Sequence, residues 1–158
     1  MCRRPTFTLF LVAVAVLVAA PLRGAELRIS NLEDVDFGVV AGSANRIQQH
    51  IRICVSSAPA GPYQLTALGN AAGGHFKLTS GGAAELDYAV LASPRGRGKA
   101  QPMTPGVPMS GFMAKEPRGN GACQPPFSFV IIEIDPVDVQ GVPGGQYSAT
   151  LQLIVAPE

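Results

Sequence analysis

Residues 144–158 read GGQYSATLQLIVAPE and hold the most regular pattern in the chain. Apolar or aromatic side chains occupy every second position, namely Tyr147, Ala149, Leu151, Leu153 and Val155. Polar residues fill the positions between them, and only Ile154 interrupts that polar side. Successive side chains of a strand point to opposite faces, so this alternation predicts a half-buried β-strand. We expect it either to be the last strand of a complete sandwich or to be covered in part by another chain.

The remainder of the chain has the composition of an all-β domain. Its 158 residues suit one domain, and charged residues are only 15% of them. The 18 glycines and 14 prolines divide the sequence into short runs rich in valine, isoleucine, threonine and aromatic residues. Short runs of this kind between turn residues favour an Ig-like sandwich or a related β-fold over a helical one.

Six to eight short strands are expected from the apolar alternation and the turn residues. They lie within residues 27–37, 46–56, 63–68, 76–78, 85–93, 127–134 and 147–155, with one more near 110–114. The run 127–134 is apolar on both faces, which predicts a central strand covered on each side. The proline-rich stretch from Pro94 to Pro126 reads mostly as a long connection, and connections of this length are often functional or mobile.

The N-terminus has the pattern of a secretory signal. Arg3 and Arg4 precede the uncharged apolar run 7–20, which is short for a membrane span of ~20 residues. We therefore predict a cleaved signal peptide over residues 1–25 and one β-domain over residues 26–158, with no membrane span after cleavage. Earlier cleavage and retention as an anchor are the alternatives.

The predicted mature chain carries nine basic and eleven acidic residues, a net charge of −2, because residues 1–25 contain three arginines. A nearly neutral chain gives no electrostatic case for binding nucleic acid. Two cysteines remain, Cys54 and Cys123, and in an oxidising compartment one disulfide is the simplest expectation. It would close a loop of roughly 70 residues, worth about 4 kcal/mol in the chain-entropy model. Two free thiols are the alternative. They would require retention in the cytosol, which a signal peptide contradicts.

No catalytic or metal-binding pattern is apparent. His50 and His75 have no neighbouring cysteine or acidic residue at a zinc-ligand spacing. The acidic residues at 33, 34 and 36 lack the spacing of an EF-hand, and PRGRGKA at 94–100 lacks that of a P-loop. The sequence therefore predicts no enzyme, no cofactor and no metal.

Four segments together resemble the spore coat protein U domain, the fold of archaic, Csu-type chaperone–usher pilus subunits. They are NLEDVDFGVVAGS (31–43), IRICVSSAPAGPYQLTAL (51–68), GGAAELDYAVLAS (81–93) and GGQYSATLQLIV (144–155). Their order and spacing are similar to those of the family, whereas the proline-rich middle of the chain is not.

The resemblance implies an incomplete Ig-like sandwich that a donor strand completes. A periplasmic chaperone, an outer-membrane usher and neighbouring pilus subunits are the implied partners, and the pilus or cell surface, reached through the periplasm, is the implied location. Strand addition of this kind uses main-chain hydrogen bonds for affinity and side-chain pockets for register. The closing strand, with Tyr147, Ala149, Leu151, Leu153 and Val155, is then expected to meet the chaperone or donor strand.

Two departures from the family matter. The first predicted strand has no cysteine, so Cys54 is expected to pair with Cys123. Only residues 26–36 precede Phe37 in the predicted mature chain, which leaves no donor segment. We therefore expect a subunit that accepts a strand without donating one, at the fibre tip or another terminal position. The alternative is a self-contained periplasmic or secreted β-sandwich that binds a ligand, with residues 94–126 as the place of binding.

Overall fold

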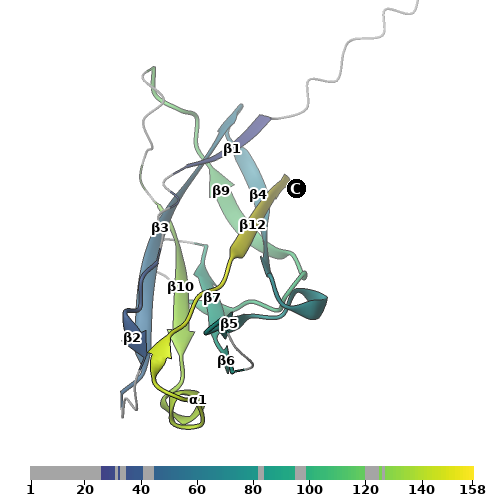
Figure 1. The fold of residues 1–158 in the computed structure, drawn as a ribbon. Coiled ribbons are helices and arrows are strands. Elements are labelled where there is room, and N and C mark those ends of the chain that lie inside the picture. The colour runs from purple at the N-terminus through teal and green to yellow at the C-terminus, as the bar shows by residue number, and fades with distance from the viewer. Residues whose placement is uncertain are drawn as a thin grey trace, which may run out of the picture.

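The computed structural model describes residues 26–30, 32, 35–40, 45–81, 84–94, 99–119, 125 and 127–158. Within these residues the chain forms antiparallel sheets that face each other as a β-sandwich (Figure 1). The all-β fold predicted from the alternating sequence is therefore confirmed. The signal peptide predicted over residues 1–25 lies outside the described residues.

The larger sheet has five strands. In spatial order they are β1 (Glu26–Ser30), β3 (Ile47–Ala58), β10 (Ser128–Ile134), β7 (Ala89–Ser93) and β8 (Gln101–Pro102). Strand β10 pairs with β3 on one side and with β7 on the other, so the central position predicted for this run is correct. Its outward-facing Phe129 and Ile131 are only half-buried, so that face is less covered than the sequence predicted.

The second sheet has three strands. These are β12 (Leu151–Pro157), β4 (Gly61–Gly69) and β9 (Met109–Ala114), in that spatial order. Two small pairs complete the arrangement: β2 (Val39–Val40) with β11 (Gly145–Gln146), and β5 (Lys77–Thr79) with β6 (Glu85–Asp87). The position of β9 agrees with the short strand predicted near 110–114, whereas β8 was not predicted.

The core fills the space between the two large sheets. Tyr63, Leu65 and Ala67 of β4 alternate inward and are fully buried, because every second residue of a strand faces the same side. Across the sandwich, Ile53 and Val130 are equally buried. The ring of Tyr63 packs against Phe112 of β9 with centroids 5.1 Å apart.

Several predicted strands are shorter or interrupted in the structure. The run 27–37 forms β1 but leaves the ladder before Val35, and the run 85–93 splits into β6 and β7. A short helix, α1 (Pro136–Gln140), lies between the predicted strands 127–134 and 147–155, and Asp135 caps it by accepting a 3.0 Å hydrogen bond from the Val137 amide. One 3₁₀ turn, η1 (Ala72–Gly74), connects β4 towards β5.

The alternation along β3 places Cys54 on the strand face opposite Ile53 and Val55, and this face is buried at Cys54 as well. Only 6% of the residue is exposed, and its register partner in the neighbouring β1 is Ser30. Cys54 takes part in a disulfide. Cys123 lies outside the described residues, so its identity as the partner stays a prediction.

Candidate functional site

Strand β12 has one paired and one unpaired edge. Along the paired edge its residues match β4 in an unbroken register, from Leu151 opposite Gly69 to Pro157 opposite Tyr63. Along the other edge, no strand of the described part of the chain forms a ladder with β12. Backbone N–H and C=O groups at such an edge are free to pair with another strand.

The inward face of β12 is incompletely covered. Leu151, Leu153 and Val155 alternate towards the core as predicted, yet each remains half-buried. The inward residues of the adjacent β4, by contrast, are almost completely inaccessible to solvent. The two strands share a sheet and face the same core, so the difference indicates that cover is missing over β12.

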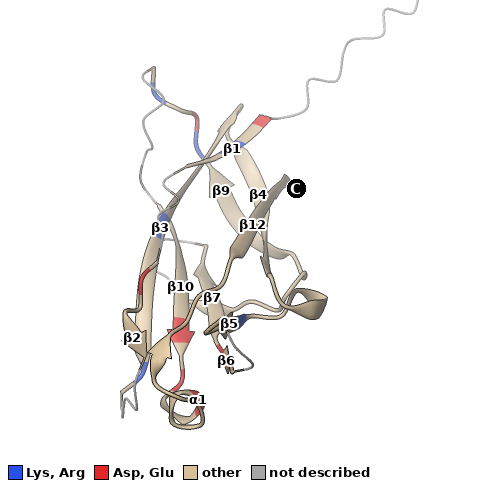
Figure 2. Cartoon of the chain, in the orientation of Figure 1, with Lys and Arg blue, Asp and Glu red and all other residues tan. Residues whose placement is uncertain are grey.

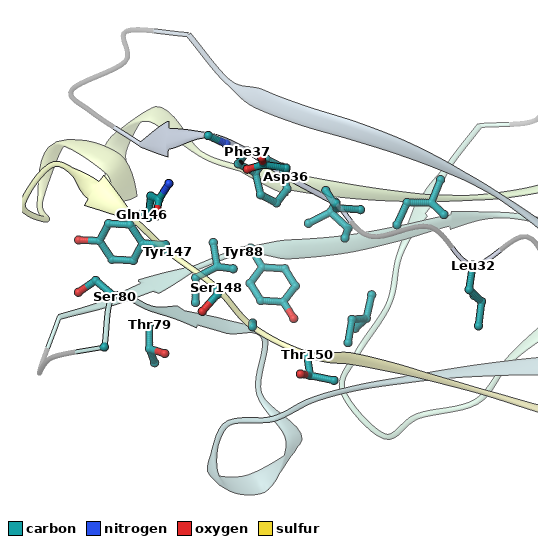
Figure 3. A pocket seen from close by; sticks show the side chains of 18 of the residues that line it. Leu32, Asp36, Phe37, Thr79, Ser80, Tyr88, Gln146, Tyr147, Ser148 and Thr150 are labelled. Atoms are coloured by element: carbon teal, nitrogen blue, oxygen red, sulfur yellow. Dashed lines mark hydrogen bonds between the residues drawn. The ribbon is translucent and has the colours of Figure 1, made fainter.

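A groove of about 790 Å³ opens beside this edge (Figure 3). One wall is the segment before β2, and the other is the stretch that joins β11 to β12. The floor lies between the two walls and includes Thr79 and Tyr88. The lining residues of the groove include Phe37, Thr79, Tyr88, Tyr147, Ser148, Ala149, Leu151 and Leu153. The second wall lies along residues 146–153. An extended strand that paired along its whole length would therefore have about eight residues.

The wall opposite β12 consists of residues that the sequence assigned to the first strand. Val35 and Phe37 are half-buried there, and both pack against the core. The chain turns at Gly38, whose φ of 66° favours glycine and whose amide donates a 2.7 Å hydrogen bond to Asp36 Oδ1. The ladder of β1 ends at Ser30, and residues 35–38 line the groove opposite β12.

One end of the groove is closed by pairing. Strand β2 pairs with β11, with Val39 opposite Gln146 and Val40 opposite Gly145. Next to this pair, the Tyr147 hydroxyl donates a 2.6 Å hydrogen bond to the Pro143 carbonyl, the kind of bond that holds a corner in Ig sandwiches.

Ser148 and Thr79 join the wall to the floor. The amide of each donates a 2.9 Å hydrogen bond to the carbonyl of the other, in an isolated antiparallel bridge. Because this bridge ties residue 148 to β5, residues 147–150 do not extend the ladder of β12 with β4. Of the uninterrupted strand predicted over 147–155, only residues 151–155 therefore belong to β12, and residues 147–150 form a bridged segment that connects it to β11.

Tyr88 contributes to the floor from the residue between β6 and β7. Its ring packs against Phe76 with centroids 5.5 Å apart, and its amide donates a 3.1 Å hydrogen bond to the Phe76 carbonyl. Its hydroxyl is buried and has no hydrogen-bond partner in the described part of the chain. Burial raises the pKa of Tyr88, since the charged phenolate would be poorly solvated there.

The groove is weakly charged. Asp36 is the one charged side chain among its described lining residues, and β12 carries no charged residue (Figure 2). Ion pairs lie outside the groove lining, such as Lys77 with Glu85 at 2.8 Å and Arg46 with Glu133 at 3.1 Å. A groove of this composition suits an apolar or uncharged polar occupant, because a charge placed there would lose hydration without gaining a partner.

Four of the five predicted edge residues line the groove. Tyr147, Ala149, Leu151 and Leu153 do so, whereas Val155 shares their face but is not part of the lining. A role for any of them in binding a chaperone or donor strand stays a prediction. The sequence did not single out Tyr88, although its place among the alternating apolar residues of 85–93 correctly marked it as inward-facing.

The other residues considered for chemistry are not brought together. His50 and His75 are both exposed, on β3 and after η1 respectively. Residues 33, 34, 95 and 97 lie outside the described part of the chain. Among the residues that are described, no three His, Cys, Asp or Glu side chains are grouped as metal ligands would be. No helix in the described ranges has both the length and the apolar character needed to cross a membrane.

No protein-family model matches the sequence. A search of curated proteins by sequence likewise finds no match. The fold is similar to that of a solved structure described as a chaperone–tip adhesin complex vital for synergistic activation of CFA/I fimbriae biogenesis, with a TM-score of 0.60 and 13% identity. The likeness covers 84% of this chain and 42% of that chain, so this chain spans less than half of its neighbour's length. At this identity the likeness shows the fold alone, a β-sandwich.

Proposed function

We propose that this protein is a structural subunit of a chaperone–usher pilus or surface fibre, whose sandwich is completed by a strand from another protein. The observation that carries the proposal is the free edge of β12 beside a groove, with the inward side chains of that strand half-buried. An added strand would pair with this edge and cover those side chains at the same time. The fold likeness to a fimbrial chaperone–adhesin complex supports the same assignment.

The proposed occupants of the groove are a strand of a periplasmic chaperone before assembly and a strand of a neighbouring subunit in the fibre. Tyr147, Ala149, Leu151 and Leu153 are the proposed contacts, and Val155 would lie just beyond the contact region. We propose that residues 26–158 form one domain of the spore coat protein U type, which the resembling sequence segments support. Delivery by an usher and display at the cell surface follow from membership of that class.

A tip or terminal position in the fibre is part of the proposal. Strand β1 starts at Glu26 and is already paired with β3, from Glu26 opposite Ala58 to Ser30 opposite Cys54. Residues of this strand are therefore engaged within their own sheet and are poor candidates for donation to a neighbour. N-terminal sequencing of the secreted protein tests this idea, because a mature start well before Ala19 would provide a donor segment and argue for a place in the shaft.

A self-contained ligand-binding sandwich is the competing function, and the volume of the groove is the observation in its favour. About 790 Å³ lies within the range of small-molecule pockets. A small-molecule pocket does not require an unpaired strand edge beside it, because a single small ligand cannot form hydrogen bonds with a whole row of backbone groups.

Expression in the periplasm decides between the two functions. The chain is produced alone and together with a cognate pilus chaperone, and both samples are separated by size-exclusion chromatography. We expect aggregation or degradation of the chain alone and a one-to-one complex with the chaperone. A stable, soluble monomer without chaperone would show that the sandwich is already closed, and the subunit proposal would then be wrong.

A further inference from the structure

The three tyrosines of the chain differ in how their hydroxyls are satisfied. The Tyr63 hydroxyl lies 3.1 Å from Ser128 Oγ, and the Tyr147 hydroxyl donates to the Pro143 carbonyl at 2.6 Å. The Tyr88 hydroxyl is buried and has no hydrogen-bond partner among the described residues. A buried hydroxyl without a partner has given up its hydrogen bonds to water and gained none in return, so its presence calls for an explanation.

Tyr88 cannot easily turn its hydroxyl elsewhere. The residue is 7% exposed, its ring packs against Phe76, and its amide is hydrogen-bonded to the Phe76 carbonyl. Figure 3 shows the ring among the side chains that line the groove, with the hydroxyl directed towards the wall that carries Ser148 and Thr150. The hydroxyl is thus held at the floor of the groove.

We propose that the Tyr88 hydroxyl selects the occupant of the groove, by forming a hydrogen bond with a serine, threonine or asparagine side chain at one inward-facing position of an inserted strand. The proposal rests on the function proposed above and adds a specificity-determining residue to it. Without such a partner, the buried hydroxyl leaves its hydrogen-bonding capacity unused.

The geometry of strand addition favours a side chain over a backbone group as the partner. The N–H and C=O groups of an inserted strand lie in the plane of the sheet and point towards the neighbouring strands. Its alternate side chains point towards the floor, where Tyr88 lies between β6 and β7. Sites that are built to hydrogen-bond a hydroxyl discriminate strongly against an analogue that lacks it.

Synthetic strand peptides test the proposal. The parent peptide has about eight residues, with valine at every inward position and uncharged polar residues between, matching the length of the wall. In each further peptide one inward valine is replaced by threonine, which has nearly the same shape and adds one hydroxyl. The mature chain is refolded with each fluorescently labelled peptide, and dissociation constants are measured by anisotropy.

We expect one threonine peptide to bind about three- to tenfold more tightly than the parent, which is the range for one added hydrogen bond. The preference should disappear in Tyr88→Phe. It should persist in Tyr63→Phe, the matched control, because Tyr63 does not line the groove and its hydroxyl is bonded to Ser128.

The outcomes separate this inference from the proposed function. If peptides bind but no inward threonine is preferred, or if the preference survives in Tyr88→Phe, the role of Tyr88 is wrong and the strand-accepting groove stands. If Tyr88→Phe weakens all peptides equally, the hydroxyl does not select a side chain and the proposal is again wrong. If no strand peptide binds at all, the proposed function fails together with the inference.

Discussion

Tyr63 and Tyr88 lie in the same core, and burial raises the pKa of both phenols above their ordinary value of 10.0. For Tyr63 the hydrogen bond with Ser128 acts in the opposite direction and is the smaller effect. The folded protein therefore holds these two phenolic protons to higher pH than the unfolded chain does. Their contribution to the free energy of unfolding is complete below pH 10.0 and is lost as the pH rises through the folded-state values.

We accordingly expect the chaperone-bound protein to lose thermal stability steeply above a pH of about 10. A Tyr63→Phe, Tyr88→Phe double variant should lose less over the same range, since neither position can then ionise. Thermal unfolding of wild type and variant at neutral and alkaline pH measures the difference, and the tyrosines of the chaperone contribute equally to both samples. If the thermal stabilities of wild type and double variant fell equally with rising pH, Tyr63 and Tyr88 would not be the source of the alkaline loss.

At the level of the single element, β12 offers a matched pair of substitutions. Leu153 faces the groove, whereas its neighbour Ile154 faces outward and is 42% exposed. We expect Leu153→Asp to abolish the chaperone complex, because an inserted strand would bury the carboxylate without a partner. Ile154→Asp introduces the same charge on the same strand and should leave the complex intact.

Co-purification of tagged chaperone with each variant provides the measurement. A Leu153→Asp subunit that still co-purifies at the wild-type level would show that the groove face of β12 is not the contact. Equal loss in both variants would point to a general effect of charge on the strand rather than to the groove.

Alternation along single strands was readable from the sequence, and it correctly predicted β3, β4, β9, β10 and the inward face of β12. What it could not predict are effects that depend on partners distant in sequence. The bridge from Ser148 to Thr79 removes residues 147–150 from the main ladder, although their pattern is perfectly strand-like. Likewise, α1 forms within a short segment that is rich in turn residues, and a capping hydrogen bond to the Asp135 side chain stabilises its first turn.

The same reason explains how much of the site was predicted. The wall formed by β12 was identified because a periodic pattern specifies which side chains face inward. The opposite wall includes the turn at Gly38, and a glycine in a strand-like run marks either the end of the strand or a bend within it. The unpaired hydroxyl of Tyr88 is a property of the packed core, since three tyrosines on similar alternating runs end in three different hydrogen-bonding situations.

For the molecule as a whole, the predicted Cys54–Cys123 disulfide would link β3 to the segment before β10. Loss of a bridge closing roughly 70 residues should cost about 4 kcal/mol in the chain-entropy model. We expect Cys54→Ser, Cys123→Ser and the double variant to be destabilised by similar amounts, because removal of either thiol breaks the same bond.

Thermal unfolding of the three chaperone-bound variants under oxidising conditions tests this pairing. Additive losses in the double variant would mean that the two cysteines act independently and that Cys54 has another partner. Wild type treated with reductant serves as the control, and its stability should fall to that of the variants.

The reciprocal hydrogen bonds between Thr79 and Ser148 also have a practical consequence. Both amides lie at the border of the groove and belong to a bridge with no further rungs on either side. An isolated bridge opens more readily than a ladder, so these two amides should exchange with deuterium quickly while the groove is empty. Slower exchange of these two amides would report that the groove is occupied. The measurement works in the intact protein, without an attached label and without knowing what has bound.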